Sequence, residues 1–442
     1  MRKVSIAILL LCTFPLLAIP RYDLSYRVSG KTSVFMKDGS LDQWVKEGRP
    51  VVLGGSFAVE FNPTGRWHSL QQWNNASIGV GATYFNLGND KMLGSAVATY
   101  GYINFPFYNG RHFRIGVRPS VGIAFCNKRY SNTVPEGYTP YSGDGGFEKS
   151  NQSIGSILNA YLAGELYMDF PIKDGWEITL NGGWNHISNG SFMAPNKGYN
   201  MFGGEIGVRY RPGIQKSNDS ISTPKPDVPR KLYDGVDKRW AVEISASGSA
   251  RQNYYRDNVN GQHFFGVATL KVAAYWVPIG IFRLGAGFDA FYDGYYACVT
   301  YDRDDPTKQP GNPQGNTITY FQKTYLAESD VKNCFRVGFS IQPELIIGKL
   351  TAGLHVGVYL FDPVKNLEPF AEAKAAAEAG TPLNRGIFYS YDYSKASTKQ
   401  DGWCYMHFVL KYHVLDHLFV QVGMKAHGMR AEFLDAGLGV AF

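Results

Sequence analysis

Apolar and polar residues alternate along most of the chain from Tyr22 onward, in one short stretch after another. A period of two residues predicts β-strands with one apolar and one polar face. In the first half the pattern predicts strands at 22–33, 50–61, 76–86, 93–107, 112–125, 156–171, 176–189 and 200–211. In the second half it predicts strands at 240–250, 263–276, 281–296, 334–346, 350–361, 403–413, 417–427 and 431–442.

The connections between these strands alternate in length. Tight turns at 108–111 and 171–175 contrast with the long, polar, glycine-rich segment 126–155, and the second half has long segments at 297–333 and 362–402. Short turns on one side and long loops on the other are typical of outer-membrane β-barrels. The fold class predicted is therefore all-β, a transmembrane antiparallel barrel.

The segment 213–238 divides the predicted strands into two sets. It is rich in Pro, Ser, Lys and Asp, a composition that cannot bury a core and predicts a linker, here on the periplasmic side. We expect two tandem eight-stranded barrels, 21–212 and 239–442, the second of unknown role. One barrel of about sixteen strands is the alternative.

The N-terminus and the composition favour export to the outer membrane. Met1-Arg2-Lys3 followed by the apolar run 4–17 predicts a signal peptide over residues 1–20 that is cleaved. No later apolar run is long enough for a helical span. Aromatic residues make up 15% and charged residues 18% of the chain, and the net charge is +7. A modest positive charge suits anionic glycolipids, while scattered basic residues argue against nucleic-acid binding.

Four cysteines follow the signal peptide: Cys126, Cys298, Cys334 and Cys404. None has the spacing of zinc ligands, and we expect neither a metal nor a cofactor. Whether Cys298 and Cys334 form a disulfide in an oxidising compartment stays open at this point.

One predicted strand carries a candidate catalytic pair. Alternation over 176–189 places His186 and Ser188 on the apolar, lipid-facing side, at the exposed interfacial end of the strand. Two residues apart on a strand, their Cα atoms are roughly 7 Å from each other. A histidine at that distance can take the proton of a serine hydroxyl. By spacing alone the alternative is that both polar residues simply mark the end of the strand.

A longer motif carries a resemblance. His186-x-Ser188-Asn189, then Pro195-Asn196-x-Gly198 and a strand ending in Arg209-Tyr210-Arg211 resemble the PagL-type lipid A 3-O-deacylases, over about residues 22–211. The resemblance implies a lipid-facing site in which Ser188 is the nucleophile and His186 its general base. It also implies that Asn189 and the backbone after it, at Gly190, bind the oxyanion.

The chain departs from that family at Asn200, which stands where the family usually has a glutamate to orient the histidine. An asparagine oxygen can hold an imidazole tautomer but adds no negative charge. Asn200 has the parity of the lipid-facing set. Glu205 has the opposite parity, and we expect it in the lumen as an ion pair with Arg209.

The function predicted is that of an outer-membrane serine esterase that removes the 3-O acyl chain of lipid A. Its partners are then lipopolysaccharide and the outer membrane of a Gram-negative bacterium, with a homodimer left open. The alternative is a non-catalytic barrel, either a pore or a structural protein; a third interpretation makes the second half a binding module. That half has no equivalent pair, because parity places His427 and Lys425 in its lumen.

Overall fold

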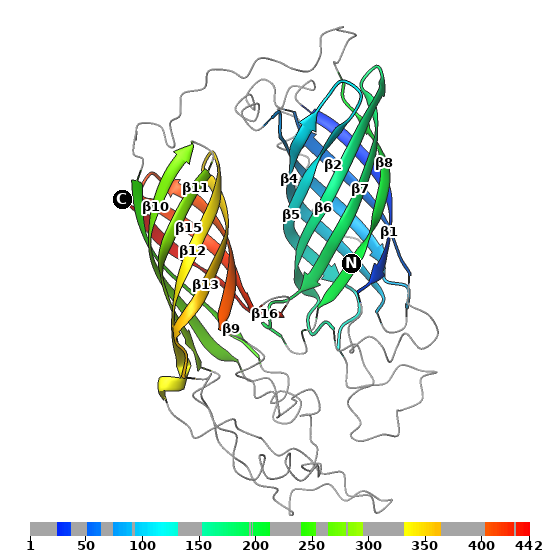
Figure 1. The fold of residues 1–442 in the computed structure, drawn as a ribbon. Helices are drawn as coiled ribbons and strands as arrows, with labels where there is room; N and C mark the ends of the chain where they lie inside the picture. The colour runs from blue at the N-terminus through cyan, green and yellow to red at the C-terminus, as the bar shows by residue number, and fades with distance from the viewer. Residues whose placement is uncertain are drawn as a thin grey trace, which may run out of the picture. The chain divides into compact units, whose positions relative to one another are not determined.

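The computed structural model contains two closed antiparallel barrels of eight strands each (Figure 1). It describes residues 24–36, 51–62, 74–90, 93–130, 153–193, 196, 198–212, 240–252, 264–279, 282–294, 331–363, 403–427 and 430–442. The prediction of two tandem barrels is confirmed, and the single barrel of about sixteen strands is wrong.

The first barrel, coloured blue to green in Figure 1, closes where its first strand pairs with its last. The first and last strands pair antiparallel, from Tyr26 opposite Tyr210 to Phe35 opposite Met201. Its strands are β1 (Leu24–Phe35), β2 (Val51–Phe61), β3 (Ser77–Asn86), β4 (Ser95–Asn109), β5 (Arg114–Cys126), β6 (Leu158–Lys173), β7 (Trp176–Ser188) and β8 (Tyr199–Tyr210). Closure leaves the sheet without an unpaired edge.

The second barrel closes in the same way, with β9 paired to both β10 and β16. A short 3₁₀ helix, η6 (Val331–Cys334), precedes β12. The strands of the second barrel are β9 (Trp240–Arg251), β10 (Phe265–Ile279), β11 (Phe282–Asp293), β12 (Phe335–Ile347), β13 (Leu350–Phe361), β14 (Cys404–Leu415), β15 (Leu418–His427) and β16 (Arg430–Ala441).

All sixteen strands were predicted from the alternation, with ends that differ by at most three residues. The predicted signal peptide, the linker 213–238 and Cys298 lie outside the described residues. No helix in the described part of the chain has the length and apolarity needed to cross a bilayer.

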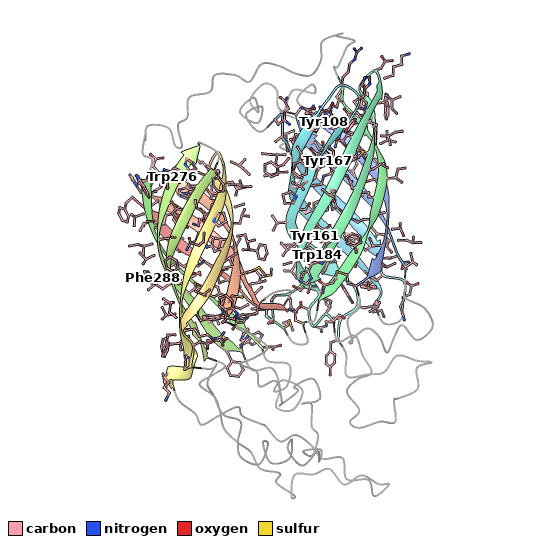
Figure 2. The ribbon with its side chains drawn as sticks, in the orientation of Figure 1. Tyr108, Tyr161, Tyr167, Trp184, Trp276 and Phe288 are labelled. Atoms are coloured by element: carbon pink, nitrogen blue, oxygen red, sulfur yellow. The ribbon has the colours of Figure 1, made fainter. Side chains whose placement is uncertain are left out.

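The outward faces of both barrels are apolar. Val28 and Ile206 of the first barrel expose about three-fifths of their side chains, at 62% and 63%. Aromatic side chains gather at the short-turn end of this barrel, where Trp176 packs against Tyr210 with ring centroids 4.7 Å apart and Tyr108 is exposed (Figure 2). An apolar band flanked by aromatic residues is the surface that a membrane barrel presents to lipid.

The interior of the first barrel is filled with paired charges. Arg209 contacts Asp169 (Nη1 to Oδ2, 2.6 Å), Glu177 (Nη1 to Oε2, 2.9 Å) and Glu60 (Nε to Oε2, 3.0 Å). Glu205 pairs with Arg27 (Oε1 to Nη1, 3.0 Å). Glu205 and Arg209 are thus both luminal, as expected, but the predicted pair between them is wrong. Each has nearer partners on other strands, because buried charges pair with whichever opposite charge the barrel's closure brings within reach.

The second barrel has its own luminal network. Glu344 contacts Arg283 (2.6 Å), Lys411 (2.7 Å) and His355 (2.8 Å) through its carboxylate oxygens. Beyond it lies an aromatic and aliphatic cluster of Val267, Phe291, Tyr405 and Phe433. Eight strands enclose a space just wide enough for side chains. Both interiors are therefore packed cores.

Candidate active site

Strand β7 ends in the predicted pair. His186 Nε2 and Ser188 Oγ are 2.8 Å apart, a hydrogen-bond distance. The outward-facing residues earlier on the strand, Ile178 and Leu180, are 39% exposed, whereas Glu177 and Thr179, which alternate with them, are buried in the lumen. The pair continues the outward set, so it lies on the outer wall of the first barrel, as the alternation predicts.

The surroundings of the pair differ from the prediction in one respect. His186 is 5% exposed and Ser188 is 1% exposed, so the expectation of an exposed end of the strand is wrong. Neighbouring side chains on the same wall account for part of the cover: the ring of Trp184 stacks on that of His186 with centroids 5.4 Å apart and planes 17° from parallel. A dry setting strengthens hydrogen bonds within the site.

Asn200 lies directly across from the histidine. It pairs with His186 in the register between β7 and β8, and its Oδ1 is 2.8 Å from His186 Nδ1. Asn200, His186 and Ser188 thus form one continuous hydrogen-bonded row. The structure brings together the three residues predicted as catalytic.

Trp184 is a member of this site that the sequence analysis did not identify. Its indole Nε1 is 3.3 Å from Asn200 Oδ1, so one oxygen accepts from both the indole and the imidazole. In Figure 2 Trp184 lies at the opposite end of the first barrel from Tyr108. The available signal was parity, since Trp184 precedes His186 by two residues and shares its face.

Gly198 shows why the motif has a glycine here. Its φ is +75°, a conformation that side chains disfavour. A Cβ atom at this position would lie 2.7 Å from His186 Cε1 and 3.2 Å from Ser188 Cβ. The backbone of residue 198 therefore packs directly against the pair, and any side chain would displace it.

The predicted oxyanion residues follow Ser188. The backbone N–H of Asn189 donates to Asn196 Oδ1 at 2.9 Å, and its Nδ2 donates to Ser156 Oγ at 2.9 Å and to the Met193 carbonyl at 2.7 Å. Asn189 and Asn196 thereby organise this connection, and Gly190, directly after Asn189, has a φ of +60°. Pro195 lies outside the described residues.

The row of Ser188, His186 and Asn200 can transfer the serine proton to the imidazole although none of the three side chains needs to be charged beforehand. The serine hydroxyl can donate to the imidazole, and the asparagine oxygen can accept from the other ring nitrogen. That is the arrangement of a nucleophile, its base and an orienting group. Within the described residues no three His, Cys, Asp or Glu side chains are grouped so that they could hold a metal ion.

Two family models match the chain. The model described as lipid A 3-O-deacylase (PagL) matches residues 55–209, which include the whole of the row. The model described as acyloxyacyl hydrolase, C-terminal domain, matches residues 240–372 and 386–442. No curated protein matches the chain.

Several solved structures match the chain at low sequence identity. Neisserial surface protein A is 10% identical, and the match covers 42% of this chain and 96% of that one at a TM-score of 0.26. The outer membrane enzyme PagL is 14% identical, with 41% and 97% covered and a TM-score of 0.25. A triple mutant of the Rhodopseudomonas blastica porin is 11% identical, with 95% and 99% covered and a TM-score of 0.18.

Proposed function

We propose that this chain, because it belongs to the lipid A 3-O-deacylase (PagL) family, is an outer-membrane serine esterase that hydrolyses the ester-linked 3-O acyl chain of lipid A. Membership of the family implies hydrolase activity and a lipid A substrate. The observation that carries the finer proposal is the 2.8 Å contact between His186 Nε2 and Ser188 Oγ on the outer wall, with Asn200 behind the histidine.

The chemistry follows from this row. His186 Nε2 takes the proton of Ser188 as Oγ attacks the ester carbonyl carbon, and a tetrahedral oxyanion forms. The intermediate collapses by breaking the bond to the sugar oxygen, which leaves with the proton held by His186. A water molecule then gives a proton to His186 and attacks the acyl-enzyme, and the fatty acid departs as Ser188 regains its proton.

The oxyanion needs donors near the serine. We assign this role to the connection that begins with Asn189 and Gly190, directly after the nucleophile. In the structure the Asn189 N–H and Nδ2 groups donate to Asn196, Ser156 and Met193, so Asn189 holds this connection in place. The donor to the oxyanion is then the backbone N–H that follows it, at Gly190. Preorganised backbone N–H groups stabilise a developing oxyanion most when they need not move during the reaction.

The alternative functions fit the structure less well. A pore needs an open lumen with its polar groups around it, whereas the interior of the first barrel contains Arg209, Glu177 and their partners packed against one another. A purely structural barrel has no use for a serine and a histidine on the wall that faces lipid. The apolar outward face supports placement in the outer membrane.

The experiment is mass spectrometry of lipid A from a Gram-negative host with and without the protein. We expect loss of one 3-O hydroxyacyl chain with the wild type and no loss with Ser188→Ala, while both proteins remain heat-modifiable on gels. The rate should rise with pH as the imidazole loses its proton, because only the neutral ring accepts the serine proton. Deacylation by Ser188→Ala would exclude Ser188 as the nucleophile.

A further inference from the structure

We propose that Trp184 is a positioning residue for this reaction: its indole N–H holds the Asn200 carboxamide in the orientation that makes His186 a base. This inference rests on the proposed function of the same site. It assigns to Trp184, which contacts the asparagine and the histidine, the role of orienting an asparagine at the position where the family usually has a glutamate.

An asparagine behind a catalytic histidine raises a problem of direction. A carboxamide has an acceptor at one end and a donor at the other. If its NH₂ end faced His186 Nδ1, that nitrogen would have to accept, and the ring proton would move to Nε2. Nε2 could then take no proton from Ser188. In the serine-protease template, exchanging the orienting aspartate for asparagine costs about 10⁴-fold through this wrong tautomer.

Trp184 resolves the direction because an indole nitrogen can only donate. Its Nε1 lies 3.3 Å from Asn200 Oδ1, on the same atom that lies 2.8 Å from His186 Nδ1. A rotated carboxamide would set its NH₂ group against the indole N–H, two donors with no acceptor between them. The oxygen therefore faces both rings, Nδ1 carries the imidazole proton, and Nε2 keeps its lone pair toward Ser188 Oγ at 2.8 Å.

The position of the indole is itself fixed by the site. Trp184 stacks on His186 at 5.4 Å between centroids, two residues away on the same face of β7, and Asn200 follows from the register of β8. A carboxylate would not need this help, because both of its oxygens accept. The proposal thus predicts that the importance of the Trp184 N–H depends on which residue stands at position 200.

The test is a double-mutant cycle on the full-length protein, assayed by release of the 3-O acyl chain from lipid A. Trp184→Phe keeps an aromatic ring over His186 but removes the N–H. We expect kcat to fall about tenfold with KM unchanged, the size of one net hydrogen bond. In the Asn200→Glu background we expect Trp184→Phe to change kcat less than about twofold.

Trp176→Phe is the matched control, since it makes the same change on the outward face of the same strand, at the opposite end, where Trp176 packs against Tyr210. It should leave kcat unchanged. Equal losses from Trp184→Phe in both backgrounds would overturn the proposal and leave Trp184 a packing residue, and so would no loss in either. A wild type that releases no acyl chain would contradict the proposed function itself.

A second readout is independent of turnover. ¹⁵N NMR of the histidine rings in detergent, with the His186 signals assigned by their loss in His186→Gln, reports which ring nitrogen is protonated. We expect the Nδ1–H tautomer in the wild type and a mixture of both tautomers in Trp184→Phe, with Asn200→Glu restoring the single tautomer. An unchanged single tautomer in Trp184→Phe would overturn the proposal even if kcat fell.

Discussion

Each barrel has a histidine near the end of its penultimate strand, and the two face opposite ways. His186 on β7 lies on the outer wall beside Ser188. His427 on β15 lies in the lumen, where its Nε2 is 2.7 Å from the Tyr359 hydroxyl and its Nδ1 is 3.5 Å from Glu432 Oε2. Glu432 also contacts Arg336 at 2.9 Å.

The comparison teaches that the parity of a strand decides what a histidine can do. In the lumen, His427 is part of a network of paired charges, and the barrel wall separates it from any lipid ester outside. On the outer wall, His186 has a neutral serine, a neutral asparagine and an indole around it. The same residue type packs in the lumen of one barrel and is the proposed base on the outer wall of the other.

The largest effect should separate the two histidines. His186→Gln should lower acyl release by about 10³-fold or more, because nucleophile and base act as a unit. His427→Gln should leave acyl release within about twofold. Its effect should appear in urea unfolding of the second barrel, as a loss of about 1–3 kcal/mol from a perturbed buried hydrogen bond. Equal losses of activity in both variants would contradict the comparison.

Gly198→Ala should come next, with kcat lower by about 10²-fold. The added methyl group would meet His186 Cε1 at 2.7 Å and force the ring away from Ser188. Steady-state kinetics on lipid A checks this, with Gly164→Ala as the control, since a Cβ there meets nothing within 4 Å. Wild-type kcat in Gly198→Ala would show that the imidazole does not depend on this close approach.

A smaller effect should follow from restoring the family's charge. Asn200→Glu should raise kcat about tenfold, because a carboxylate stabilises the imidazolium formed as the serine attacks. Asn200→Ala should lower kcat, though less than Ser188→Ala. Glu205→Gln, in the lumen beside Arg27, should affect the midpoint of unfolding more than kcat. If Glu205→Gln abolished turnover while Asn200→Ala did not, the orienting role would move to Glu205.

The smallest effect should come from removing the second barrel. A variant that ends near residue 212 keeps the complete closed first barrel and should deacylate lipid A within about twofold of the full chain. Heat-modifiable migration on gels reports whether the barrel forms. An assembled but inactive truncated protein would show that the second barrel contributes to the reaction.

Most of the fold could be predicted from the sequence, because successive residues of a membrane-barrel strand alternate between the apolar outer face and the polar inner face. The strands, the outward pair and the luminal position of Glu205 all follow from that alternation. Alternation does not by itself show how the strands close into two barrels, because the pairings of β1 with β8 and of β9 with β16 join residues far apart in the chain. Partners inside the lumen were missed for the same reason: Glu205 meets Arg27, 178 positions away, and not Arg209.

The site was predicted in part. Parity and the motif placed His186, Ser188 and Asn200 together. The cover over the pair and the contact from Trp184 to Asn200 could not be predicted, because both depend on how side chains from two strands and a connection meet in space. Tryptophan is common on the lipid-facing surface of membrane proteins near the interface. Its residue type alone therefore did not indicate a role for Trp184 in the site.

The neutrality of the row has a consequence for depth in the membrane. An ionised glutamate on a lipid-facing wall is costly, and the cost grows toward the middle of the hydrocarbon. In the proposed mechanism Trp184, Asn200, His186 and Ser188 carry no charge before the reaction, since the imidazolium and the oxyanion form only during attack. The resting site can therefore lie deeper among acyl chains, and closer to a buried ester, than a site built on a carboxylate.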